Sequence, residues 1–215
     1  MEKILVFASG TKDGGGSGFE ALAASSKTGI LGAEIVMVVS NHESGGVRKK
    51  AAMWNIPFRY YPGPYTKDAY QKIFDESRAT FVALSGWLKK AAGLDPKRTV
   101  NIHPGPLPHF GGKGMYGMHV HEAVIEAFRK GELAQTAVSM HFVTEEYDEG
   151  PVFFHYPILI FENDTPETLS HRVWEVEHAW QPWITNLVVS GQISWDGKHP
   201  VSLRVPPWYT FHKQK

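Results

Sequence analysis

Two polar residues with the chemistry of acid–base catalysis lie at the end of a short apolar segment in the stretch Thr99–Pro108. Val100 and Ile102 predict a buried strand, and the prolines that follow end it because proline has no N–H for a sheet ladder. Asn101 and His103 are two residues apart, so an extended chain places both side chains on one face. An imidazole transfers protons and an amide donates hydrogen bonds to an oxyanion, so the pattern indicates a catalytic site. The alternative is structural, with His103 hydrogen-bonded at a strand end and Asn101 in a turn.

A third candidate, Asp148, lies in the acidic turn Thr144–Pro151 between two segments with the pattern of strands. Gly150-Pro151 restricts this turn just before an apolar run. If the turn folds back to the preceding strand end, Asn101, His103 and Asp148 form one constellation. The carboxylate would raise the pKa of the histidine, and the protonated imidazole and the amide would stabilise an oxyanion. No serine or cysteine is placed as an obvious nucleophile, so the attacking group would belong to the substrate.

A glycine-rich loop follows the first predicted strand and has the composition of an anion-binding site. Ile4–Ala8 is an apolar run typical of a central parallel strand, and five glycines occur between Gly10 and Gly18. Ser17 followed by Glu20 has the spacing of a capping box, which predicts a helix start close to Gly18. Free N–H groups and the positive end of a helix dipole bind phosphate at such a place. The loop matches neither the Rossmann fingerprint nor the Walker pattern, and a flexible tight turn is the alternative.

Strands and helices alternate along the first half of the chain. The apolar patterns predict strand 34–39, helix 46–54, strand 56–60, helix 67–77 and strand 80–84. This alternation predicts a doubly wound, Rossmann-like α/β fold with a mostly parallel sheet, in which ligands bind at the carboxyl ends of the strands. The glycine loop, Ser85-Gly86 and the Asn101–His103 segment follow such ends, so we expect them to converge on one cleft.

The second half of the chain predicts a change of strand direction. Segments 135–143 and 152–160 read as strands joined by a turn of eight residues, which is too short for a crossover helix. We therefore expect one antiparallel strand in the sheet. Thr165-Pro166 predicts the start of a long helix. The tail over 191–215 is predicted to form a hairpin, with strands at 193–195 and 201–203.

Composition limits the class of protein. The chain has 215 residues, of which 42% are apolar and 20% charged, which suits one α/β domain. Its formal net charge of zero argues against non-specific binding to nucleic acid or to an anionic membrane. The chain contains no cysteine, which excludes disulfides, thiol nucleophiles and cysteine-ligated metals. The first apolar run is too short for a signal peptide and no run approaches a membrane span, so we expect a soluble, cytoplasmic protein.

Taken in order, the motifs of this chain resemble those of the phosphoribosylglycinamide formyltransferases, a family of folate-dependent formyltransferases. The motifs are Asn101-Ile102-His103-Pro104, Leu107-Pro108, His141–Thr144 and Asp148–Val152, with further similarity at Ser9-Gly10, Leu84–Trp87, Gly112–Gly117 and Glu177–Ala179. They cover nearly the whole chain. The resemblance implies a formyltransferase-type fold with a single domain over 1–215. It also implies transfer of a formyl group from the co-substrate 10-formyltetrahydrofolate to the amine of glycinamide ribonucleotide, in purine synthesis.

The resemblance further implies a role for particular residues. A positively charged His103 and Asn101 would hold the oxyanion, while Asp148 would orient His103 and assist proton transfer. The phosphate and ribose would be bound by Gly10, Gly14, Gly15, Gly16, Ser17, Gly18 and Glu177. The folate would be bound by Trp87, Leu88, Lys89, Val143, Thr144, Glu145 and Tyr147. Residues 1–100 would form the ribonucleotide half, 101–190 the catalytic and folate-binding half, and 191–215 the tail; no metal is required.

The chain departs from the family pattern at three places that concern the acceptor. The glycine loop is longer, Gly105-Pro106 stands where a small or serine-containing stretch is usual, and Lys89 replaces an arginine. The alternatives are a formyltetrahydrofolate hydrolase, a formyltransferase for another amine, and a non-catalytic folate- or nucleotide-binding module. The hydrolase usually carries an N-terminal regulatory domain, and the enzymes acting on tRNA or sugar nucleotides an additional C-terminal domain, so the length favours the ribonucleotide enzyme. Both a monomer and a homodimer fit the sequence.

Overall fold

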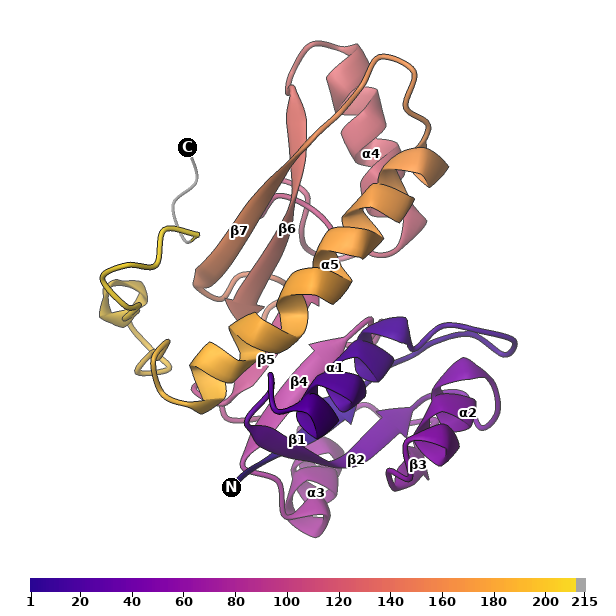
Figure 1. Cartoon of the computed structure of the whole chain (residues 1–215), viewed down its shortest axis with the longest axis vertical. Coiled ribbons are helices and arrows are strands. Elements are labelled where there is room, and N and C mark those ends of the chain that lie inside the picture. The colour runs from indigo at the N-terminus through magenta and orange to yellow at the C-terminus, as the bar shows by residue number, and fades with distance from the viewer. Residues whose placement is uncertain (212–215) are drawn as a thin grey trace.

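The computed structural model describes residues 1–211, in which seven strands form one sheet of order β3-β2-β1-β4-β5-β6-β7 (Figure 1). The strands are β1 (Glu2–Phe7), β2 (Ala33–Ser40), β3 (Phe58–Tyr60), β4 (Phe81–Ser85), β5 (Thr99–His103), β6 (Gln135–Phe142) and β7 (Val152–Leu159). The helices are α1 (Ser17–Thr28), α2 (Gly46–Met53), α3 (Lys67–Ser77), α4 (Met118–Arg129), α5 (Pro166–Val189) and the short 3-10 helix η1 (Pro200–Ser202).

One strand runs against the rest of the sheet. Strands β1 to β5 are parallel, whereas β6 pairs antiparallel with both β5 and β7. The predicted α/β fold, with a mostly parallel sheet and one antiparallel strand, is therefore confirmed. In the β5–β6 register Asn101 lies opposite His141 and His103 opposite Ser139. This register brings a polar row of β6 beside the two candidate catalytic residues of β5.

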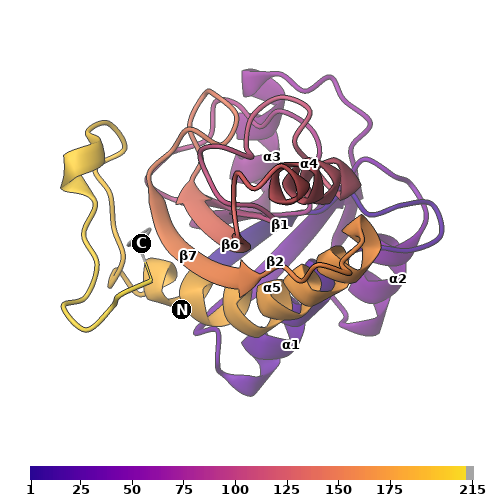
Figure 2. The same cartoon turned by 90° about the horizontal axis from the view of Figure 1, so that it is seen from above.

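Helices cover both faces of the sheet, as a doubly wound fold requires. Helices α1 and α5 pack against each other on one face, whereas α3 covers the opposite face (Figures 1 and 2). The alternation of side chains along β1 explains the two cores, because Ile4 and Val6 join the α1–α5 core while Leu5 and Phe7 join the α3 core. The carboxyl ends of the parallel strands are left open between these layers.

Helix α1 begins where the sequence predicts, but its N-terminus is built differently. The N-cap is Gly16, with a left-handed φ of +76°, and no side chain caps the helix. Ser17 is therefore the first helical residue, one position too late to act as a cap. Glu20 forms an ion pair with Lys50 of α2. The predicted capping box of Ser17 and Glu20 is wrong, because a glycine in the left-handed region already turns the chain into the helix.

Helix α5 begins as predicted, and a partly buried ion pair lies beside its first turns. Thr165 is the N-cap, and its side chain accepts a hydrogen bond from the Thr168 N–H at 3.3 Å. Arg172 donates to the two carboxylate oxygens of Asp164 at 2.8 and 3.0 Å, and the Phe161 N–H donates to the same carboxylate at 2.8 Å. These donors fix the chain that enters the helix from β7.

We expect Asp164→Asn to lower stability in a pH-dependent way. The Arg172 guanidinium lowers the pKa of Asp164 to about 2 from its usual 3.8. Because the folded pKa lies below the unfolded one, this group contributes on the order of 2 kcal/mol above about pH 4, and the contribution is lost as the pH falls toward 2. Urea unfolding should therefore show a difference of this size between wild type and variant at pH 7 that shrinks near pH 2.5. A difference that does not change with pH would contradict the assignment.

The tail departs from the predicted hairpin. Among the described residues it holds a single antiparallel bridge, Ser194 to Arg204, and the predicted strand at 201–203 is wrong because Pro200–Ser202 forms a 3-10 helix. The reason is local: the Asp196 carboxylate accepts from the N–H of His199 at 2.8 Å, which closes a turn in place of a two-stranded ladder. Residues 212–215 of the predicted tail lie outside the described residues.

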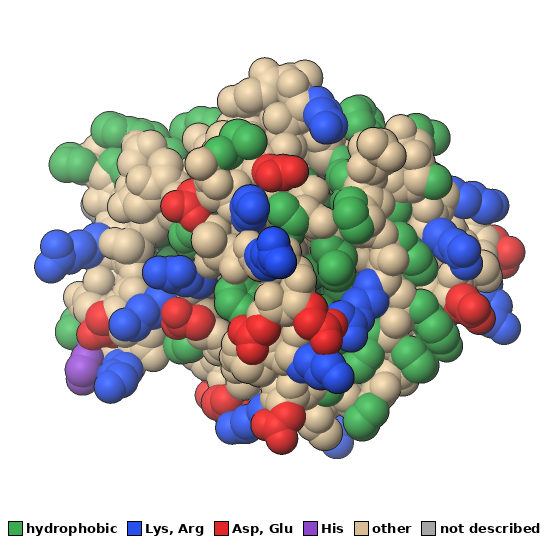
Figure 3. All heavy atoms as spheres, turned by 90° about the horizontal axis from the view of Figure 1, so that it is seen from below, with side chains coloured by type: hydrophobic (Ala, Val, Ile, Leu, Met, Phe, Trp, Pro, Cys, Tyr) green, Lys and Arg blue, Asp and Glu red, His purple; other side chains and the backbone are tan. Residues whose placement is uncertain are grey.

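Charges of both signs are mixed on the surface. On the face that carries α3, Lys and Arg side chains lie among Asp and Glu side chains (Figure 3). An example is Glu76 of α3, which pairs with Arg59 and lies 4.0 Å from Lys72. This distribution agrees with the net charge of zero. Within residues 1–211 no helix is both long and apolar enough to cross a bilayer.

Candidate active site

A cavity of about 990 Å³ opens at the carboxyl ends of β1, β4 and β5. It lies where the strand order reverses between β1 and β4, the place where doubly wound sheets bind ligands. The cavity is lined by the glycine loop, Ser85–Leu88, Asn101–Pro104, Gly112–Met118, Tyr147-Asp148 and one face of α5. The sequence prediction that the glycine loop, Ser85-Gly86 and the Asn101–His103 segment converge on one cleft is confirmed.

Asn101, His103 and Asp148 meet on one wall of this cavity. The Asn101 amide nitrogen lies 3.4 Å from Asp148 Oδ1, and His103 Nδ1 lies 3.8 Å from Asp148 Oδ2. The β6–β7 turn folds back to the end of β5, and the Gly112 N–H donates to Asp148 Oδ2 at 2.9 Å. Asp148 has a left-handed φ of +56°, a conformation that aspartate and asparagine adopt more readily than most residues. Gly150 ends the same turn against the backbone of Phe142, where an added Cβ would collide with the carbonyl oxygen.

His141 is a fourth member of this cluster, and sequence reasoning did not include it among the site residues. Its Nε2 lies 3.1 Å from the Asn101 amide nitrogen and 3.3 Å from Asp148 Oδ1. Its Nδ1 lies 2.8 Å from the Phe142 carbonyl oxygen, which can only accept, so Nδ1 carries a proton. The signal in the sequence was a histidine within the alternating strand 135–143. Only the β5–β6 register shows that it faces Asn101.

His103 does not have the raised pKa that the sequence argument predicted. Burial lowers the pKa of His103 below its usual 6.5 and outweighs Asp148 and the Phe110 carbonyl oxygen, which raise it. The imidazole is therefore neutral at pH 7 in the unliganded protein. Its Nε2 lies 2.6 Å from the Phe110 carbonyl oxygen, so the proton of the neutral ring is on Nε2. Nδ1 is then the basic nitrogen, and it faces Asp148.

Asp148 is ionised in the same surroundings. Burial raises the pKa of its carboxyl, but the contacts with His141, the neighbouring His103 and the Gly112 N–H together outweigh it, so the pKa lies below 3.8. The site thus holds a carboxylate facing a neutral imidazole, with an amide beside both. This arrangement can accept a proton and hold it between His103 Nδ1 and Asp148 Oδ2.

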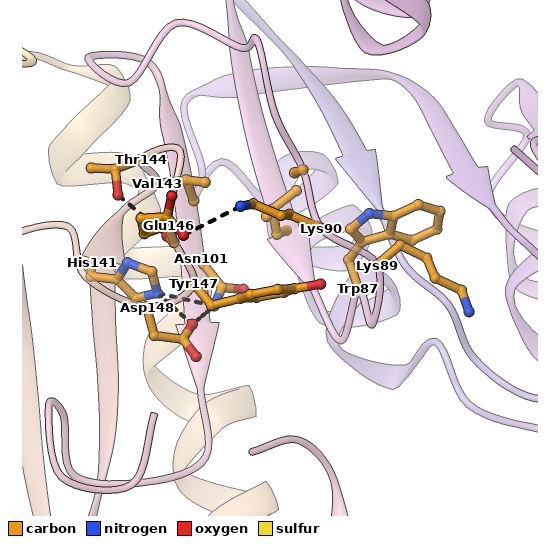
Figure 4. A pocket seen from close by; sticks show the side chains of 12 residues that line it. Trp87, Lys89, Lys90, Asn101, His141, Val143, Thr144, Glu146, Tyr147 and Asp148 are labelled. Carbon is orange, nitrogen blue, oxygen red and sulfur yellow. Dashed lines mark hydrogen bonds and ion pairs between the residues drawn. The ribbon is translucent and has the colours of Figure 1, made fainter. Parts of the chain in front are cut away.

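A smaller pocket of about 50 Å³ lies on the other side of Asn101 and Asp148 (Figure 4). The predicted folate-binding residues Trp87, Lys89, Val143, Thr144 and Tyr147 line it, together with Leu84, Lys90, Ala91, His141 and Glu146. Lys90 Nζ reaches the Glu146 carboxylate at 3.3 Å (Figure 4). Leu88 lines the large cavity instead. Glu145 lines a separate hollow of about 130 Å³ and pairs with Lys67 at 2.9 Å.

Trp87 forms a fixed aromatic wall shared by both pockets. Its indole N–H donates to the Tyr70 hydroxyl of α3 at 2.9 Å, and its ring lies 5.3 Å from that of Phe7. Lys89 Nζ lies over the Tyr65 ring at 5.6 Å, on the same side of the sheet. A flat, anchored wall of this kind suits a planar aromatic ligand.

The glycine loop presents most of its predicted residues to the large cavity, which is lined by Gly10, Gly15, Gly16, Ser17 and Gly18. Gly14 does not line it. Its carbonyl oxygen accepts from the Thr11 N–H at 2.9 Å and its own N–H donates to Thr11 Oγ1 at 2.8 Å, so it closes the loop on itself. Gly18 lies so close to β4 that an added Cβ would stand 2.2 Å from Ser85 Oγ.

Glu177 lines the large cavity from α5, the helix that packs against α1. Burial raises the pKa of its carboxyl to about 8, which favours the protonated form. A protonated carboxyl both donates and accepts hydrogen bonds, which suits it to sugar hydroxyls. One turn further along α5, Gln181 lies 3.1 Å from Ser85 Oγ and fixes the helix to β4.

Comparison with known proteins places this geometry in a family. Residues 2–185 match the family described as Formyl transferase. The chain is 33% identical over 205 residues to the chloroplastic phosphoribosylglycinamide formyltransferase of Arabidopsis thaliana, covering 90% of this chain and 68% of that protein. It is 32% identical over 192 residues to the phosphoribosylglycinamide formyltransferase of Bacillus subtilis, covering 85% and 92%.

A solved structure agrees in fold and in sequence. The crystal structure of phosphoribosylglycinamide formyltransferase from Bacillus halodurans has a TM-score of 0.74 and 30% identity to this chain, covering 88% of this chain and 96% of that one. The sheet order, the open strand ends and the motifs at the cavity thus occur together with a family match over most of the chain. This chain belongs to the formyl transferase family.

Proposed function

We propose that this protein transfers the formyl group of 10-formyltetrahydrofolate to the amine of glycinamide ribonucleotide. The observation that carries the proposal is that Asn101 and Asp148 line both pockets, at the junction between the glycine-loop cavity and the aromatic pocket. A phosphorylated acceptor and a planar donor that bind on the two sides would place their reacting atoms at this junction. The names of the relatives that cover most of the chain support the choice of acceptor and donor.

The large cavity suits the ribonucleotide. The α1 N-terminus would bind the phosphate through the backbone N–H groups that follow Gly16, where the helix dipole favours negative charge. Glu177 would bind the ribose hydroxyls from α5. Gly14 closes the loop and has no place in this scheme, so we assign the phosphate to Gly15, Gly16, Ser17 and Gly18 instead.

The smaller pocket suits the pterin of the folate. Trp87 would pack against the ring, and the Val143–Asp148 turn would bind its polar edge with backbone groups. Lys90, held to Glu146 at 3.3 Å, stands beside Tyr147 at 5.8 Å and would border the same site. The formyl group on N10 would then reach Asn101 and His103.

The transfer itself needs donors for an oxyanion and an acceptor for a proton. The amine attacks the formyl carbon, the carbonyl electron pair moves to oxygen, and the Asn101 amide exchanges its 3.4 Å contact with Asp148 for the new oxyanion. His103 Nδ1, backed by the Asp148 carboxylate, takes a proton from the attacking nitrogen. The C=O bond then re-forms, the carbon–N10 bond breaks, and N10 leaves with the electron pair and takes up a proton.

A formyl-transfer assay with and without acceptor tests the proposal. With 10-formyltetrahydrofolate and glycinamide ribonucleotide, we expect turnover that depends on the acceptor and yields the formylated ribonucleotide. Release of folate at the same rate without acceptor would instead identify a hydrolase. Binding of folate with no turnover under either condition would overturn the proposed activity in favour of a binding module.

A further inference from the structure

A half-exposed tryptophan of α5 forms a hydrogen bond with the first residue of α1 at the large cavity. Trp174 is 44% exposed and, like Ser17, lines this cavity. Its indole N–H donates to Ser17 Oγ at 3.0 Å, joining residues 157 positions apart in the sequence. The contact therefore links two elements that the sequence alone leaves unrelated.

The indole is held in place by its own helix. The His178 ring lies 4.2 Å from the Trp174 ring at an interplanar angle of 37°, and its Nδ1 donates to the Trp174 carbonyl oxygen at 2.6 Å. The His171 ring lies 5.7 Å from the same indole at an interplanar angle of 36°. These two tilted ring contacts limit the rotation of the indole, whose N–H points toward Ser17.

The hydrogen bond has one chemical consequence for Ser17. An indole nitrogen can only donate, so the Ser17 oxygen is the acceptor and its own O–H hydrogen is left for another partner. Within residues 1–211 the structure pairs that hydrogen with no acceptor. Ser17 is also the residue that follows the N-cap Gly16, beside the backbone N–H groups assigned to the phosphate. A hydroxyl there with its oxygen already occupied is a donor for an anion.

We infer that Trp174 is a positioning residue that holds the Ser17 hydroxyl as a hydrogen-bond donor to the phosphate of the acceptor. The inference rests on the proposed function, because it takes the ligand of the glycine-loop end to be a phosphate monoester. It deepens that function by assigning acceptor recognition to a contact between α5 and α1. It concerns affinity for the phosphorylated acceptor, and the formyl chemistry at His103 is unchanged.

The test compares Trp174→Phe with Ser17→Ala and with the double variant. Phenylalanine keeps an aromatic ring beside His171 and His178 but has no N–H to donate. We expect KM for glycinamide ribonucleotide to rise about tenfold in Ser17→Ala and about fivefold in Trp174→Phe. The double variant should show about the tenfold effect alone, because both substitutions remove the same contact. Neither kcat nor KM for 10-formyltetrahydrofolate should change by more than about twofold.

A binding measurement removes the dependence on turnover. In calorimetry without folate, Trp174→Phe should raise the Kd for glycinamide ribonucleotide about fivefold. The phosphate-free riboside should bind wild type and variant with equal Kd. Trp180→Phe is the matched control, since Trp180 lies on the same helix but packs against Phe154 and Tyr156 at 5.9 and 5.4 Å. Its binding constants should equal those of the wild type.

Several results would overturn the inference. One is a Trp174→Phe protein with wild-type affinity for the ribonucleotide; another is a double variant whose loss is the product of the single losses. If Trp174→Phe weakened the binding of the riboside and the ribonucleotide equally, the role of Trp174 would be packing and not phosphate recognition. If the wild type neither binds nor formylates glycinamide ribonucleotide, the proposed function itself fails. Normal wild-type turnover with an unaffected Trp174→Phe variant refutes only the role of Trp174.

Discussion

Replacing His103 by asparagine is expected to lower kcat for formyl transfer by about 10²- to 10⁴-fold. The asparagine amide is too short to reach the Phe110 carbonyl oxygen, which the Nε2 of His103 contacts at 2.6 Å. Near the position of Nδ1, which faces Asp148, it offers an amide that cannot take up a proton. Single-turnover measurements with saturating substrates would separate this loss from any change in binding.

The pH dependence of His103→Asn provides a second observation. Burial lowers the pKa of His103 below its usual 6.5, so wild-type kcat at saturating acceptor should fall at acid pH, once Nδ1 becomes protonated. The variant should lack this fall. Activity that rises as the pH drops below 6.5 would show that the charged imidazole is the active form.

A matched histidine variant guards against a general effect on the fold. His119 is exposed at the start of α4, where its Nδ1 lies 3.2 Å from Glu122, and it does not line the cavity. His119→Asn should keep wild-type kcat. A loss below tenfold in His103→Asn would mean that this histidine does not take part in the chemistry.

Replacing Asp148 by asparagine is expected to lower kcat by a comparable 10²- to 10⁴-fold factor. Asparagine tolerates the left-handed φ of +56° at this position and its oxygen can still accept from the Gly112 N–H, so the turn should keep its shape. The variant removes the negative charge that raises the pKa of His103, so that pKa should fall further. NMR titration of the His103 ring and single-turnover kinetics measure the two effects.

The neighbouring exposed Glu149 is the control for Asp148. Glu149→Gln removes the same charge one residue away, and it should leave kcat within about twofold of wild type, because surface charges act weakly at this range. If Asp148→Asn and Glu149→Gln cost the same, the effect of Asp148 would be one of overall charge. A fall in the His103 pKa without a fall in kcat would show that the carboxylate tunes the imidazole but does not serve the transfer.

The sequence predicted the sheet well because its signals are local. Buried strands such as Ile4–Ala8 are continuous apolar runs. An eight-residue turn is too short for the crossover that parallel strands need, so it predicts an antiparallel pair. The same local reasoning was wrong at two places, the start of α1 and the tail, where the chain adopts a different local structure from the predicted one. The chain enters α1 at a left-handed Gly16 and not through a serine cap, and the tail closes by side-chain hydrogen bonds around Asp196 in place of a ladder.

The site was predictable as far as it follows from strand ends and motifs. Asn101 and His103 share a face because strand side chains alternate, and the turn that ends in Gly150-Pro151 indicated Asp148 as a third candidate. His141 was not predicted as a site residue because its position in the site depends on which strand lies beside β5. That pairing joins residues 40 positions apart in the sequence. Trp174 was not predicted for the same reason, since its partner Ser17 is 157 positions away in the sequence.

The sequence by itself determined the class of fold, the strand ends that line the cavity, and the family, because periodicity, chain breakers and motifs are properties of neighbouring residues. Only the tertiary structure determined the direction in which the pKa of His103 is shifted. The sequence argument raised the pKa of His103 by pairing it with Asp148, but a side chain only 3% exposed loses more from desolvation than it gains from a carboxylate 3.8 Å away. Burial is a sum over the packing of the whole chain, and no stretch of the sequence contains it.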